Sequence, residues 1–156
     1  MDKSVIVETV ADEVRAATGC MIAAMNNLAG PYGKVYGRSV CDLYYACYHL
    51  GRALLASRGI SANSQEAVQR LLALHFVKPA ALPQDTIAKL NELMDKRHVA
   101  DYKPYIPIGV GDISAFRPWI AGFVRNTLKL MGKSAPVPEA KSLQKAAEDF
   151  ERLPLE

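Results

Sequence analysis

Apolar residues recur every three or four positions along most of the chain, which is the spacing of one face of a helix. In the first segment, for example, Val7, Val10, Val14 and Ala17 follow this period. No segment alternates between apolar and polar residues as a strand of a half-buried sheet does. The pattern predicts five principal helices, at about residues 4–28, 36–58, 63–78, 84–101 and 112–131.

Glycine, proline and capping residues mark the ends of these helices. The run GPYG at residues 30–33 ends the first helix, Gly59 ends the second, and two prolines with two glycines make residues 102–111 a loop. Asn63 is a suitable N-cap for the third helix, and Asp112 for the fifth. Short connections favour antiparallel neighbours, so the expected fold class is all-α, an up-and-down bundle of about five helices.

The end of the chain differs from the rest. The segment KSAPVPE after Gly132 has the composition of a linker. We therefore predict a helical bundle at residues 1–133, followed at residues 134–156 by a linker and a short acidic tail or helix. Within that tail, residues 138–152 predict a short surface helix whose weak apolar stripe contains Leu143, Ala147 and Phe150.

The composition is that of an ordinary globular domain. The chain has 156 residues, of which 50% are hydrophobic and 22% charged, and this excludes general disorder. No apolar run reaches the roughly 18 residues of a membrane-spanning helix. The N-terminal residues contain scattered acids and match neither a signal peptide nor a transit peptide. We therefore expect a soluble, cytoplasmic protein that does not bind membranes.

The net charge of +3 is unevenly distributed. Residues 1–30 and residues 134–156 each carry a net charge of −2, and residues 31–133 carry +7. A positive middle segment favours an anionic partner, such as RNA or the phosphate of a nucleotide. A solvated surface of mixed charge is the alternative, because the chain contains no run rich in lysine and arginine.

Several other chemistries lack their usual motifs. The cysteines form no CxxC pair and lie among apolar helical residues, so Cys20, Cys41 and Cys47 are expected to be buried free thiols. The sequence contains no HExxH or ExxH motif, no glycine-rich phosphate loop after a strand and no GxSxG elbow. We therefore expect neither a metal ion nor a cofactor.

The second predicted helix carries an unusual polar stripe on an otherwise apolar surface, which marks it as a central helix. The stripe residues are spaced by three or four positions and share one face: Arg38, Asp42, Tyr45, His49 and Arg52. Ionisable groups in such a place must be exposed, paired or functional. Either they form a hydrated outer face, with Asp42 paired to Arg38 or Tyr45, or they line a cleft that faces a ligand or a twin subunit.

A second candidate site lies at the end of the fourth predicted helix. Arg97 falls on the core-facing stripe, and Asp101 follows four residues later, so the two side chains can meet. The pair is either a structural ion pair or an arginine that holds a phosphate while Asp101 orients it. Tyr102 and Tyr105 follow directly, and their rings are suited to stack on a nucleobase.

These two segments together resemble the HEPN family (higher eukaryotes and prokaryotes nucleotide-binding). The run YYACYH at residues 44–49 is similar to the YYAxxH motif of a prokaryotic subgroup. The run RHVADY at residues 97–102 is similar to its RxxADY motif. The two motifs stand in the family's order, about 50 residues apart, and the resemblance covers roughly residues 36–130.

The resemblance implies a small helical bundle that forms a homodimer over a shared cleft. It also implies either a metal-independent ribonuclease of a toxin–antitoxin or defence system, or a non-catalytic module that binds RNA or a nucleotide. Some members partner a minimal nucleotidyltransferase. In the ribonuclease members, four to six residues separate the arginine from a following histidine. Here those positions are Tyr102, Lys103 and Pro104, so the family histidine is absent.

Three functions therefore remain open. The first is a module that binds RNA or a nucleotide through Arg38, Asp42, Tyr45, Arg52, Asp101 and Tyr105. The second is a divergent ribonuclease in which Arg97 stabilises the phosphate, His49 is the base, and Tyr102 donates a hydrogen bond or acts as the acid. The third is a protein-interaction bundle that uses the charged stripe at a dimer interface.

Overall fold

The computed structural model describes residues 1–31 and 34–155, and this part of the chain is helical, without strands. The expected all-α bundle with a short extra C-terminal helix is confirmed. Residues 32 and 33 of the predicted GPYG turn lie outside the described residues. The elements are α1 (Lys3–Ala29), α2 (Tyr36–Ser57), α3 (Gln65–Leu72), the π-helical η1 (Ala73–Val77), α4 (Thr86–Tyr102), α5 (Val110–Met131), the 3₁₀ turn η2 (Gly132–Ser134) and α6 (Val137–Arg152).

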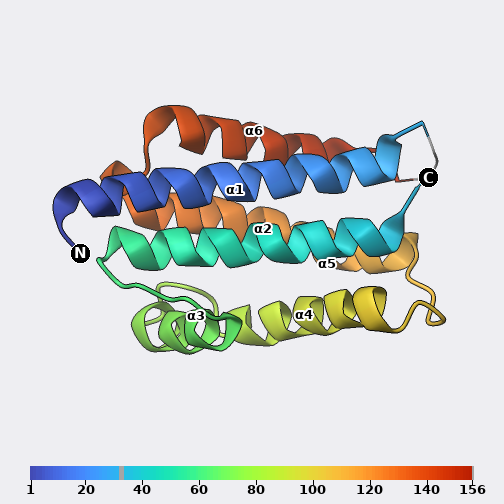
Figure 1. The fold of residues 1–156 in the computed structure, drawn as a ribbon, viewed down its shortest axis with the longest axis horizontal. Coiled ribbons are helices and arrows are strands. Elements are labelled where there is room, and N and C mark those ends of the chain that lie inside the picture. The colour runs from blue at the N-terminus through green and yellow to red at the C-terminus, as the bar shows by residue number, and fades with distance from the viewer. Residues whose placement is uncertain (32–33, 156) are drawn as a thin grey trace.

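Helix α2 lies at the centre of the bundle, as its apolar surface predicts. It packs against α1, α3, α4 and α5. Figure 1 shows α1 and α2 side by side, with α3 and α4 along the other flank of α2 and with α5 behind. The buried side of α1 is the predicted helical stripe: Val10, Val14, Ala17, Met21, Ala24 and Leu28. The small Ala24 lets α2 approach closely, and the buried Ser39 hydroxyl donates to its carbonyl at 3.0 Å.

Two predicted N-caps are wrong, one by one residue and the other by three. Helix α3 is capped by Ser64, whose hydroxyl accepts from the Ala67 N–H at 3.1 Å, and not by Asn63. Helix α5 begins at Val110, before Asp112. The Asp112 carboxylate reaches back instead and accepts from the Gly109 N–H at 3.0 Å, so it still caps the helix from its third position.

Helix α6 is a part of the bundle and not a loosely held surface element. It packs against α1 and α5, and its predicted stripe of Leu143, Ala147 and Phe150 is buried. Arg117 of α5 stabilises its end, because the guanidinium donates to the backbone carbonyls of Phe150, Glu151 and Leu153. The guanidinium also lies 5.6 Å from the Phe150 ring centroid. The domain division at residue 133 stays a prediction.

Candidate functional site

The polar stripe of α2 faces the grooves between α2 and its neighbours α1 and α4. Asp42 accepts from Asn27 of α1 at 2.9 Å, and Arg97 of α4 donates to the Tyr45 hydroxyl at 3.0 Å. The predicted Arg38–Asp42 pair exists, but its closest approach is 3.9 Å. The stripe is thus neither a purely hydrated face nor an open cleft, because most of its members bond to another helix.

Arg97 is the centre of a cluster that joins α2 to the end of α4. Its side chain is only 14% exposed, and the Asp101 carboxylate lies 3.5 Å away, as the spacing of the two residues predicts. The guanidinium carbon lies 5.4 Å and 5.6 Å from the ring centroids of Tyr44 and Tyr45. We call Arg97, Asp101, Tyr44, Tyr45 and Cys41 the Arg97 cluster.

The guanidinium of Arg97 has hydrogen-bonding capacity to spare. Nη1 makes both of the polar contacts, to Tyr45 and Asp101. Nε is buried and has no partner among the described residues. An unpartnered buried donor is costly, and native structures retain few of them. An oxyanion can reach only the exposed 14% of the side chain and not Nε itself, and a guanidinium held rigidly in this way is suited to bind one.

Two members of the Arg97 cluster, the Cys41 thiol and the Tyr44 hydroxyl, stay protonated at neutral pH. Burial and the neighbouring Asp101 raise the pKa of the Cys41 thiol to about 11, and the thiol donates to that carboxylate at 3.4 Å. Burial raises the pKa of Tyr44 to about 12. Neither group is a nucleophile or a base here, so Cys41 serves to hold Asp101 in place.

His49 belongs to a second cluster, one turn further along α2 from Tyr45. Its Nδ1 lies 2.7 Å from the Glu13 carboxylate of α1, and Arg52 lies 3.2 Å from the same carboxylate. A carboxylate can only accept, so Nδ1 carries the proton in this contact, and Nε2 of the neutral imidazole can accept one. Arg52 also lies over the Tyr48 ring, at 5.7 Å from its centroid.

A pocket of 310 Å³ opens beside the Arg97 cluster, where the start of α2 meets the end of α4 and the loop after it. Arg38, Cys41 and Asp101 line one side, and Pro104 and Pro107 of the loop line the other. The pocket therefore brings two of the predicted binding residues, Arg38 and Asp101, to one place.

The two predicted stacking tyrosines lie outside this pocket on the surface. Tyr102 is 66% exposed and packs against His98, with 4.8 Å between ring centroids. Tyr105 is 78% exposed in the loop. Tyr102, the candidate acid, therefore packs against His98 and not against Arg97. The rings beside the Arg97 guanidinium are those of Tyr44 and Tyr45.

Three site residues were missed by sequence analysis: Glu13, Asn27 and Cys41 in its role beside Asp101. A signal for the first two exists. Glu13, Cys20 and Asn27 are spaced seven residues apart, so they share the flank of the buried α1 stripe that borders α2. An acid or an amide on such a flank indicates a polar partner on the neighbouring helix, but the spacing does not identify the partner residue.

Asp42 gives a testable pH dependence of stability. Burial raises its pKa, and Arg38 and the Asn27 hydrogen bond only partly offset this effect. Ionised Asp42 therefore costs stability above its pKa, and this cost disappears at acidic pH, where the folded and unfolded states are both protonated. We expect Asp42→Asn to unfold at a higher urea concentration than the wild type at neutral pH and at the same concentration at acidic pH. An equal shift in the exposed Asp95→Asn would contradict this prediction.

Within residues 1–31 and 34–155, no three side chains of histidine, cysteine, aspartate or glutamate gather to hold a metal ion. In the same part of the chain, none of the helices combines the length and the apolar character needed to cross a membrane.

Comparison with curated proteins finds a partial similarity. No protein-family model matches the chain. The chain is similar to a curated protein of Methanocaldococcus jannaschii named "Putative toxin MJ0142", with 28% identity over 75 residues. The similar region is 48% of this chain and 51% of the relative, so the chain matches about half of that protein's length.

Proposed function

We propose that this protein is a toxin-like module of the HEPN type that binds RNA or a nucleotide phosphate at the Arg97 cluster and the pocket beside it. The observation that carries the proposal is the state of Arg97. Its side chain is 14% exposed, its guanidinium carbon lies 5.4 Å and 5.6 Å from two tyrosine ring centroids, and its buried Nε has no partner among the described residues. The similarity to the protein named "Putative toxin MJ0142" supports a toxin-like role.

The surroundings of Arg97 suit a phosphodiester ligand. Arg38 is half exposed at the pocket wall and supplies a second cation, while Asp101 orients Arg97. The exposed rings of Tyr102 and Tyr105 border the same end of the bundle and offer faces for unstacked bases. From the resemblance to HEPN proteins, we also propose that the protein forms a homodimer and that a minimal nucleotidyltransferase is its partner.

The His49–Glu13 contact favours a second candidate function, metal-independent RNA cleavage. With Nδ1 bonded to Glu13, Nε2 of His49 is available to remove the proton of a ribose 2′-hydroxyl. Arg97 would then stabilise the negative charge that develops on the attacked phosphate. Tyr102 would protonate the leaving oxygen only after turning away from His98.

Arg97→Ala tests the binding proposal. In a mobility-shift assay with end-labelled RNA in EDTA, we expect the variant to bind about ten-fold more weakly than the wild type, because it loses a charge-assisted phosphate contact. The slope of log K against log salt should become shallower by about one. The same gel shows any cleavage.

The matched control is Arg70→Ala, which removes an exposed arginine from α3 and makes the same change in net charge. It should bind RNA almost as the wild type does, and circular dichroism should show that both variants are folded. If the two variants bind RNA with equally reduced affinity, the loss is due to net charge and not to a contact made by Arg97. Wild-type protein that neither shifts nor cleaves RNA would overturn the proposal and favour a protein-interaction bundle.

A further inference from the structure

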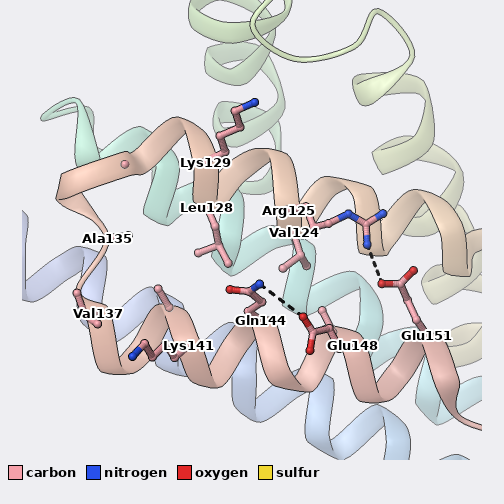
Figure 2. Close-up of a pocket in the computed structure, with 13 residues that line it drawn as sticks. Val124, Arg125, Leu128, Lys129, Ala135, Val137, Lys141, Gln144, Glu148 and Glu151 are labelled. Atoms are coloured by element: carbon pink, nitrogen blue, oxygen red, sulfur yellow. Dashed lines mark hydrogen bonds and ion pairs between the residues drawn. The ribbon is translucent and has the colours of Figure 1, made fainter.

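A second pocket lies on the other side of the bundle, away from the Arg97 cluster. It is a groove of 490 Å³ between α5 and α6 (Figure 2). Its apolar lining includes Val124 and Leu128 of α5 and Ala140 and Ala147 of α6. Val137 at one end is 63% exposed. A concave apolar surface of this volume is typical of sites for small organic molecules.

The charges of the groove are arranged with one sign at each end. Lys129 and Lys141 line the end near Val137, and neither forms an ion pair within the described part of the chain. In Figure 2 the Lys129 ammonium points away from α6, and its flexible four-carbon stem can bring it over the groove.

The opposite end of the groove is acidic. Glu151 is neutralised by Arg125 at 2.7 Å, and Glu148 adds a further negative charge. An anionic group is therefore attracted to the lysine end and repelled from the other.

The shape of the groove limits what can occupy it. From Val137 to Glu151 it runs about 21 Å along α6, at 1.5 Å per residue. A single extended hydrocarbon chain can follow an apolar groove of this length.

We propose that the α5–α6 groove binds a monomeric organic anion with an extended apolar tail, of the fatty-acid class. The tail lies on Val124, Leu128, Ala140 and Ala147, and the carboxylate lies between Lys129 and Lys141. This site is separate from the Arg97 cluster and does not depend on RNA binding.

The test is isothermal titration calorimetry of the full chain with dodecanoate, below the concentration at which it forms micelles. We expect one saturable site with a negative heat-capacity change, the mark of buried apolar surface. Lys129→Gln and Lys141→Gln should each weaken binding by about three-fold, because exposed ion pairs contribute little. Ala140→Leu, which fills the groove, should weaken it by about ten-fold or more.

The control for charge is the double variant Lys133→Gln/Lys145→Gln, which removes two cations that do not line the groove. It should bind dodecanoate as the wild type does, and Arg97→Ala should do the same. Equal weakening in this control, equal binding of dodecyltrimethylammonium, or the absence of a saturable site would overturn the proposal. Binding only to vesicles of phosphatidylglycerol would also overturn it, since the site would then recognise a membrane surface.

Discussion

Replacing Phe150 with alanine is expected to lower the free energy of unfolding by about 3–5 kcal/mol. The Phe150 side chain is fully buried where α6 packs against the bundle, so its removal loses apolar burial and leaves a cavity. The variant also loses the ring beneath the Arg117 guanidinium. Urea denaturation followed by circular dichroism measures the change.

Two further variants make this result specific. Phe150→Leu keeps most of the buried volume and should cost about 1–2 kcal/mol. Lys145→Ala on the exposed side of α6 should stay within about 0.5 kcal/mol of the wild type. If Phe150→Ala cost less than about 1 kcal/mol, α6 would not pack on the bundle in solution as it does in the structure.

The burial of α6 shows what an apolar pattern can and cannot predict. Leu143, Ala147 and Phe150 stand at the correct spacing, so the helix itself was predictable. Helix α6 has more polar and charged residues than apolar stripe residues, and for this reason the sequence predicted a surface helix. Whether a narrow stripe is buried depends on the groove that receives it, here between α1 and α5, and that groove exists only in the folded bundle.

The central position of α2 was predictable because its apolar residues surround the helix, and only an interior helix tolerates this. Helix starts were less certain. Asn63 and Ser64 are adjacent, and either side chain can cap a helix. Ser64 is the cap because its backbone is extended at φ −135° and ψ 158°, and that geometry is not visible in the sequence.

The same distinction holds for the candidate site. The Arg97–Asp101 contact follows from a spacing of four residues within one helix. The contacts of Arg97 with Tyr45 and of His49 with Glu13 join different helices. They depend on the relative rotation and translation of α1, α2 and α4, which local spacing does not determine.

The His49–Glu13 contact leads to the prediction with the largest expected effect on function. If the protein cleaves RNA, His49→Ala should lower the cleavage rate by about 10²–10⁴-fold, the usual contribution of a general base. Glu13→Ala should lower it by about ten-fold or more, with little change in KM, because the freed imidazole loses its orientation and its preferred tautomer. Single-turnover cleavage of end-labelled RNA in EDTA measures both.

Arg52→Ala separates orientation of the imidazole from simple loss of charge. Arg52 is the other partner of Glu13, at 3.2 Å, and its removal leaves the Glu13–His49 contact in place. Its effect on the rate should therefore be smaller than that of Glu13→Ala. Nitrogen NMR of His49 supplies a readout that is independent of activity: the proton should reside on Nδ1 in the wild type and in Arg52→Ala, but lose that preference in Glu13→Ala. Cleavage at the wild-type rate by His49→Ala would exclude this histidine as the base.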